Sequence, residues 1–234
     1  MRFKKIIKIS IGVIIFFTLP SLLLYGFVYF KYNEELPTGL QGDKADALAY
    51  KMLNALDYEA FENTDYIEWT FKKRRHYKWY KNENNCDVHW KDYKVNINLK
   101  DASLNKAYVH GFIIEGDVGE ELIEKAVKYF KNDSFWLVAP YNVFDEGAER
   151  RLVKNQGLLV TYKEENAKTQ NSYLWLLDEE GKPNAVKMWT PLLPINGLEA
   201  SWTDWIITES GAQLPTNHRF IFSNLGIQNL KTSL

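Results

Sequence analysis

The sequence predicts an α+β domain in which helices cover the concave apolar face of one curved antiparallel sheet, an incomplete β-barrel, preceded by an N-terminal transmembrane helix. Three observations lead to this fold. Residues 9–30 form an uncharged apolar run, four segments between residues 67 and 99 alternate apolar and polar side chains, and only two amphipathic helices are expected among many strands. Runs of strands without alternating helices do not build parallel βαβ units, so we expect antiparallel pairing.

The apolar run is long enough to cross about 30 Å of hydrocarbon. The basic residues in front of it, Arg2, Lys4, Lys5 and Lys8, favour a cytoplasmic N-terminus by the positive-inside rule. We therefore expect a cytoplasmic tail at residues 1–8, a single-pass signal anchor at 9–30, and an extracytoplasmic, periplasmic domain. A cleaved secretory signal is the alternative, but Gly26 is the one small residue near its end.

Cysteine and charge usage narrow the class of the exported part. Cys86 is the single cysteine, which excludes an internal disulfide and a lipidated N-terminal cysteine. After Lys31 the chain has 24 basic and 30 acidic residues, a net charge of −6. This charge disfavours a nucleic-acid partner and tight docking on an anionic membrane surface.

Residues 31–42 contain Pro and Gly without an apolar period and are predicted to be a tether. A single domain is then expected over residues 43–234. It begins with an amphipathic helix from Asp43 to about Asp57, since apolar residues recur there at three- and four-residue steps.

The alternating segments after this helix predict a four-stranded meander. Folding each pair about its turn places Trp69 opposite Trp79, Tyr77 opposite Trp90, and Val88 opposite Val95, all on one apolar face. The other face is polar and is expected to face water. The candidate ligand-binding residues are the apolar side chains of this face together with one later tryptophan: Ile67, Trp69, Phe71, Tyr77, Trp79, Val88, Trp90, Val95 and Trp136.

The rest of the chain predicts one more helix and several strands. The helix is expected at residues 119–131, and the strands at 107–114, 158–163, 172–178, 185–190, 198–208 and 219–222, with a turn at 178–183. Residues 132–134 are interpreted as the frayed end of the helix followed by a new cap. Trp136 then fills the core, or alternatively faces a ligand.

This arrangement resembles the outer-membrane lipoprotein carrier (LolA-like) superfamily, in an uncharacterised exported branch. The resemblance rests on the meander, the helical insertion and four segments: NDSFWLVAP at 132–140, FDEG at 144–147, GLLVTY at 157–162 and SYLW at 172–175. It implies a half-barrel plugged by helices whose concave face holds acyl chains. The chain differs from the carriers in its expected anchor.

Catalytic and metal sites are not predicted. One charged cluster could supply acid and base groups but is interpreted as surface salt bridges, because no nucleophile is nearby in the sequence; it consists of Asp145, Glu146, Glu149, Arg150 and Arg151. Cys86 and His89 should lie on opposite faces of one strand, which argues against zinc. No cofactor is expected, and the glycines near residue 116 do not form a phosphate loop.

The sequence therefore predicts a membrane-anchored extracytoplasmic domain that binds a lipid or lipoprotein acyl chain, or another apolar ligand. The alternative is an interaction or structural module of the cell envelope whose core is filled by its own helices. The two differ in whether a void remains between the helices and the face that bears Trp69, Trp79 and Trp90. An enzyme, the third class, would require titratable groups to converge in a cleft.

Overall fold

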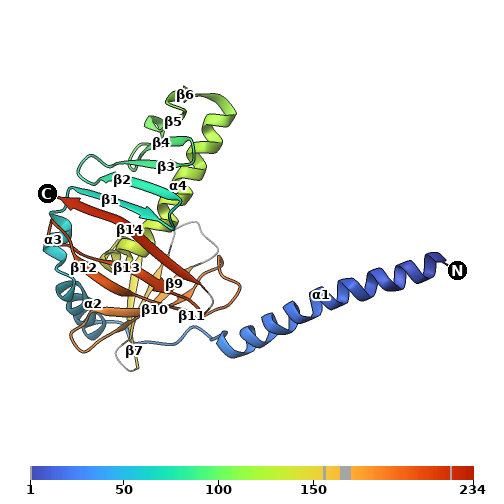
Figure 1. Cartoon of the computed structure of the whole chain (residues 1–234). Helices are drawn as coiled ribbons and strands as arrows, with labels where there is room; N and C mark the ends of the chain where they lie inside the picture. Colours follow the sequence, from blue (N-terminus) through green and yellow to red (C-terminus); the bar gives the residue numbers. More distant parts are fainter. Residues whose placement is uncertain (1, 155–156, 164–169, 222) are drawn as a thin grey trace.

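The computed structural model describes residues 2–154, 157–163, 170–221 and 223–234, and it shows a long N-terminal helix leading to an α+β body (Figure 1). Helix α1 (Arg2–Tyr32) includes a segment, Ile7–Tyr32, that is long and apolar enough to cross a membrane. Most of its apolar side chains from Ile7 onward are exposed. The predicted apolar helix is confirmed, and it extends beyond residues 9–30 at both ends.

The predicted tether contacts the body. The Glu34 N–H donates to the Asn196 carbonyl at 2.9 Å, and the Trp189 indole N–H donates to the Glu34 carbonyl at 2.9 Å. Further along, Leu40 forms an isolated antiparallel bridge with Leu152. The segment after α1 is therefore held against the body by backbone hydrogen bonds.

Two antiparallel sheets form the body. The larger has nine strands in the order β12 (Thr203–Ile207), β13 (Gln213–Arg219), β14 (Asn224–Ser233), β1 (Tyr66–Phe71), β2 (Arg75–Tyr80), β3 (Asn85–Trp90), β4 (Tyr93–Asn98), β5 (Lys106–Val109) and β6 (Phe112–Ile114). The smaller has the order β11 (Leu198–Ser201), β10 (Pro183–Trp189), β9 (Asn171–Leu177), β8 (Gly157–Tyr162) and β7 (Ala148–Val153). The chain passes from one sheet to the other at the fully buried Trp202.

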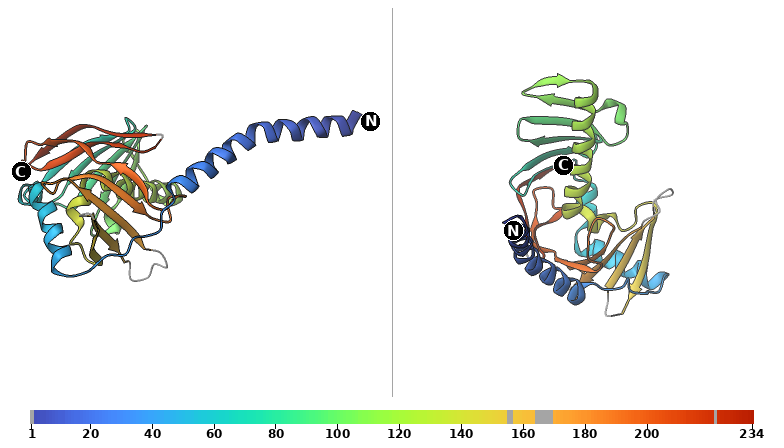
Figure 2. Two further views of the ribbon diagram at one scale, coloured as in Figure 1. Left: turned by 90° about the horizontal axis from the view of Figure 1, so that it is seen from below. Right: turned by 90° about the vertical axis from the view of Figure 1, so that its right-hand side faces the viewer.

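Helix α4 (Gly116–Val138) packs on β4, β5 and β13 and so follows the inner face of the large sheet (Figure 2). Helices α2 (Asp43–Ala55) and α3 (Tyr58–Glu62) lie at the other end, where α2 packs on β7 and β8. Two short 3₁₀ turns, η1 (Ala102–Leu104) and η2 (Ala139–Asn142), complete the helical elements of the described residues. One apolar core cluster joins both sheets to α2 and α4.

The α+β class and the antiparallel pairing are confirmed, but the expected single curved sheet is two sheets that do not close into a barrel. The meander is present with its apolar face as predicted, but two of its registers are shifted by two residues. Trp69 pairs with Tyr77, and Tyr77 pairs with Val88, whereas the predicted pair of Val88 and Val95 is confirmed. A shift of two residues keeps every side chain on its face.

Other boundaries also differ. The expected strand at 107–114 is the hairpin β5–β6, and the strand at 198–208 is divided into β11 and β12. The strand expected at 219–222 coincides with β13 only at Arg219, and its last residue lies outside the described residues. Strands β7 and β14 and most of β13 were not predicted. Helix α4 does not end at residue 131 but continues to Val138. Of the two polar residues that resemble a cap, Asp133 bonds to Arg75 of β2, and the Ser134 hydroxyl donates to the Phe130 carbonyl one helical turn earlier, so neither side chain caps a new helix.

Candidate functional site

The predicted ligand face lies beneath α4 and is packed by the chain's own side chains. Five of its residues are fully buried, and Phe71 and Trp90 are nearly so; the five are Ile67, Trp69, Tyr77, Val88 and Val95. The Phe130 ring of α4 lies 5.4 Å from the ring of the partly buried Trp79 and 6.3 Å from that of Trp69. Tyr129 makes an edge contact with Trp90 at 5.6 Å. In this structure the face is therefore occupied by aromatic side chains of the helix.

Trp136 lies in an aromatic cluster between the two sheets. Its ring stacks on Trp202 at 5.4 Å and lies 5.2 Å from His218 and 5.3 Å from Phe220. Trp136 keeps partial exposure but does not line the cavity described below, whereas its neighbour Phe135 does. Its surroundings agree with the interpretation of Trp136 as a core residue.

A buried ion pair fixes α4 to the meander. Asp133 accepts hydrogen bonds from the Arg75 Nε at 2.5 Å and from the Tyr77 hydroxyl at 2.5 Å, and its second oxygen accepts from Arg75 at 3.0 Å. Burial raises the pKa of the Asp133 carboxyl, although both donors act in the opposite direction. The Arg75 guanidinium also covers the Tyr129 ring at 4.5 Å.

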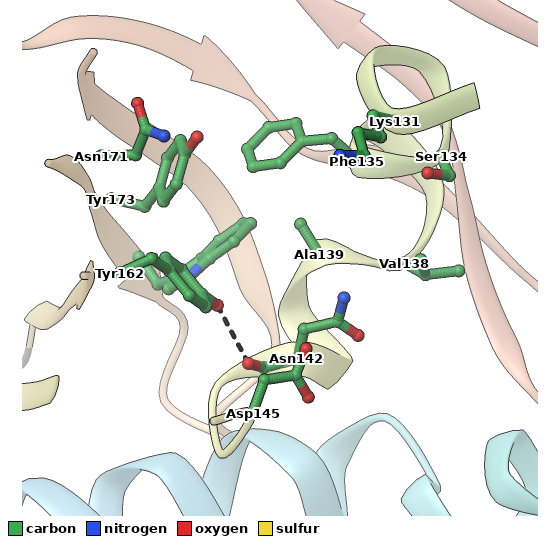
Figure 3. Close-up of a pocket in the computed structure, with 11 residues that line it drawn as sticks. Lys131, Ser134, Phe135, Val138, Ala139, Asn142, Asp145, Tyr162, Asn171 and Tyr173 are labelled. Carbon is green, nitrogen blue, oxygen red and sulfur yellow. Dashed lines mark hydrogen bonds between the residues drawn. The ribbon is translucent and has the colours of Figure 1, made fainter. Parts of the chain in front are cut away.

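A cavity of about 450 Å³ lies where the C-terminal half of α4 and η2 face the small sheet (Figure 3). One wall comes from the helical side and the other from β8 and β9, and the lining is both aromatic and polar. It consists of Lys131, Ser134, Phe135, Val138, Ala139, Asn142, Asp145, Tyr162, Asn171, Tyr173 and Trp175. We refer to it as the α4–β9 cavity.

Four aromatic rings shape this cavity. The Phe135 ring lies 4.8 Å from Tyr173, and Tyr173 lies 5.9 Å from Tyr162. The Tyr162 hydroxyl donates to the Asn142 carbonyl at 3.0 Å, which ties β8 to η2 (Figure 3). The Trp175 indole N–H has no partner among the described residues, so part of the hydrogen-bonding capacity of the sheet wall is unused.

Two titratable groups of the cavity, Tyr162 and Tyr173, are neutral phenols. The other two, Lys131 and Asp145, are exposed at its rim. Burial raises the pKa of Tyr173 to about 12, and burial together with the Asp145 carboxylate raises that of Tyr162. Partial burial and the nearby Glu62 carboxylate raise the pKa of Asp145. At neutral pH the phenols are therefore hydrogen-bond donors, and the arrangement is suited to binding.

The charged cluster near residue 150 divides into separate contacts. Glu149 pairs with Arg151 at 2.9 Å and with Lys163, which confirms the predicted surface salt bridges. Arg150 instead reaches Asp46 of α2 at 2.6 Å. Asp145 belongs to the α4–β9 cavity, a placement that the sequence did not indicate.

The predicted opposition of Cys86 and His89 is confirmed. Cys86 is buried beneath α4, whereas His89 pairs with His76 on the other face of the sheet. Within the described ranges, no three side chains of His, Cys, Asp or Glu come together as metal ligands. The expectation that the protein is not an enzyme stays a prediction.

Sequence reasoning missed the cavity wall, although the signal was present. Asn171, Tyr173 and Trp175 alternate along one face of β9, as a period of two requires. What the period does not reveal is whether the helix opposite fills the space.

No family model and no curated protein matches this chain. Among solved structures, it is similar to the crystal structure of a budding yeast polo-box domain in complex with a phosphopeptide, at 9% identity and a TM-score of 0.20, covering 76% of this chain and 82% of that one. The resemblance to the lipoprotein-carrier superfamily is not addressed by these matches and stays a prediction.

Proposed function

We propose that the chain is a membrane-anchored extracytoplasmic domain that binds a lipid or another apolar ligand, and that the ligand occupies the α4–β9 cavity. The observation that carries this proposal is a cavity of about 450 Å³ walled by four aromatic rings, while the apolar face under α4 is filled. Ligand pockets in proteins are mostly apolar clefts of about 300–1,000 Å³ with a few polar groups.

The lining fits a molecule with an apolar chain and a polar end. Phe135, Tyr173 and Trp175 offer apolar surface, and each buried methylene contributes about 0.8 kcal/mol before the losses of binding. Lys131 and Asp145 offer charged groups at the rim, where a headgroup would remain hydrated.

The helix α1 supports the same role. If the basic residues before it stay in the cytoplasm, the body is held on the far side of the membrane, next to a source of acyl chains. The ligand would then reach the cavity from the lipid phase or from a neighbouring lipoprotein.

Photocrosslinking in membranes tests this proposal. A diazirine-bearing palmitate is added to vesicles that contain the full chain, and crosslinked residues are mapped by mass spectrometry. We expect crosslinks to the cavity wall around Tyr162 and Tyr173, and crosslinks to α1 as an internal control. Ala139→Phe, which narrows the cavity, should remove the first set and leave the second.

The matched control is Ala102→Phe, at an exposed position outside the cavity, and it should change neither set of crosslinks. Crosslinks confined to α1 in the unmodified chain would overturn the proposal.

A second candidate, an envelope interaction module, is favoured by two observations. The face that bears Trp69, Trp79 and Trp90 is filled by side chains of α4, as this candidate requires. The strand β6 pairs only with β5 among the described residues, and its Phe112 and Ile113 are 76% and 57% exposed. An open apolar strand edge is a template for pairing with another chain. Phe112→Lys should abolish chemical crosslinks to a protein partner in membranes if this candidate is correct, and should leave palmitate crosslinking unchanged.

A further inference from the structure

The turns at one edge of the large sheet carry lysines in an unusual backbone conformation. Lys72 and Lys73 in the β1–β2 turn have φ of 51° and 55°, and Lys91 in the β3–β4 turn has φ of 51°. Side chains with a Cβ rarely adopt this left-handed region, and glycine or asparagine would adopt it at lower cost. The three lysines therefore stand at positions where the backbone conformation is unfavourable for a side chain.

A cavity of about 530 Å³ lies between these two turns. It is lined by Lys73, Arg74, Arg75, Trp90, Lys91 and Tyr129, four cations and two aromatic rings without a carboxylate. Arg75 is neutralised by Asp133, whereas the structure gives Lys73, Arg74 and Lys91 no ion pair among the described residues. Asp92 follows Lys91 in the turn but does not line the cavity.

The β1–β2 turn also borders a second cavity on its other side. This one, of about 360 Å³, is lined by Lys72, Lys73, Arg74 and three residues of β14, namely Asn224, Gly226 and Gln228. The side chains of Lys72, Lys73, Arg74 and Lys91 are all exposed. Together they form a basic edge, which we define by these four residues.

The basic edge faces the side on which the anchor leaves the body. In Figure 1 the arrowhead of β1, just before the turn, points toward the side from which α1 extends. Strand β3 runs in the same direction as β1, because each is antiparallel to β2, so its turn lies at the same edge. The right-hand view of Figure 2 looks onto this side, with the N-terminus of α1 toward the viewer.

We propose that the basic edge binds the phosphate groups of anionic lipids in the membrane that α1 crosses. A phosphate accepts hydrogen bonds from Lys and Arg and is attracted by their positive charge. The cavity between the turns has room for a headgroup beside three cations that form no ion pair among the described residues. The inference rests on the proposed anchoring of α1, which brings the edge to the membrane surface.

This proposal differs from the expectation that net charge disfavours docking on an anionic membrane. The exported part has a net charge of −6, but charges further apart than a Debye length of about 10 Å act independently in 0.1 M salt. A local cluster of cations can therefore dock on anionic headgroups while the rest of the body is acidic.

The test uses the full chain with a fluorescent label at one introduced cysteine. Burial raises the pKa of the native Cys86 thiol, so this cysteine is protected from labelling. The reporting variant is Asn224→Cys, next to the basic edge, and the matched control is Glu83→Cys, in the β2–β3 turn at the opposite edge. Quenching by acrylamide, a neutral molecule, is measured in vesicles of phosphatidylcholine and in an equal mixture with phosphatidylglycerol.

We expect phosphatidylglycerol to cause a loss of quenching at Asn224→Cys and no change at Glu83→Cys, and high salt to restore the quenching. Combining Lys73→Gln, Arg74→Gln and Lys91→Gln should abolish the effect of phosphatidylglycerol. The same loss of charge at Lys44, Lys100 and Lys231, which are exposed elsewhere, should leave it intact.

Two results would overturn the proposal: equal quenching in both kinds of vesicle, or equal effects of the two triple variants. Carbonate extraction of the same vesicles shows separately whether α1 is inserted. A failure of anchoring is thereby distinguished from a failure of the basic edge to bind lipid.

Discussion

His218 lies in the core of the body between two indole rings. Its Nδ1 hydrogen-bonds to the Ser201 carbonyl at 3.2 Å, and its Nε2 has no partner among the described residues. Trp202 and Trp136 lie 4.2 Å and 5.2 Å away, ring to ring. Desolvation at this site disfavours the charged imidazolium and lowers the pKa of His218 to about 4.

We expect this histidine to make the body less stable in acid. The unfolded chain binds a proton near pH 6.5 and the folded one near pH 4, so stability is complete above pH 6.5 and falls as the pH decreases between these values. The loss should approach about 3 kcal/mol near pH 4, at about 1.4 kcal/mol per pKa unit. Urea unfolding of the full chain in detergent at a series of pH values measures it.

The variant His218→Gln should remove this pH-dependent part of the unfolding free energy, whatever it does to the stability at pH 7. His110→Gln, at an exposed position, should keep the full dependence. Parallel pH profiles for His218→Gln and the unmodified chain would contradict the assignment.

The meander is the element that the sequence predicted best. Alternation of apolar and polar residues is sufficient to identify strands and faces, because a buried face must be apolar at every second position. Register depends on turn geometry. The basic residues 72–75 indicated a turn, but not the positive φ of Lys72 and Lys73 that sets its type. A helix end was misplaced for a related reason, since Asp133 has its partner, Arg75, in a distant strand.

Helix α4 approaches β6 so closely at Gly119 that a side chain has no room. A Cβ built there would overlap the carbonyl oxygen of Ile114. Alanine favours a helix over glycine by about 1 kcal/mol, but overpacking costs about 1–3 kcal/mol, so we expect Gly119→Ala to lower the unfolding free energy by about 1 kcal/mol. Denaturant unfolding checks this value.

Gly226→Ala is the matched control, since a Cβ at that position has nothing within 4 Å. It should leave stability unchanged or raise it slightly. If Gly119→Ala is the more stable of the two variants, the close approach of α4 and β6 is incorrect.

At the scale of the whole molecule, the sequence indicated the α+β class and the long apolar N-terminal helix but not the arrangement of the sheets. The two sheets part at Trp202, a residue that looks like any other aromatic strand position. The α4–β9 cavity exists because η2 follows α4 directly and faces β8 and β9, which only the tertiary structure reveals. The periodicity of apolar residues predicts which side chains are buried. It does not predict where two packed elements leave a cavity between them.

Protease protection tests the proposed topology. In sealed vesicles with the body outside, added protease should digest the body and leave a small membrane-bound fragment that contains the N-terminus and α1. Detergent should expose that fragment as well. Recovery of an intact soluble body that starts near Phe27 would instead identify a cleaved signal.

The hydrogen bonds that hold Glu34 to Asn196 and Trp189 determine how far the body reaches. The ten residues 33–42 that follow α1 would span roughly 35 Å as a free, extended chain, at about 3.3–3.6 Å per residue. Because Glu34 is held against β10, the segment cannot extend over this distance, and the body begins within a few residues of the end of α1. If α1 crosses a membrane, as proposed, the body is confined to molecules at or just above the bilayer, and its effective concentration for them is correspondingly high.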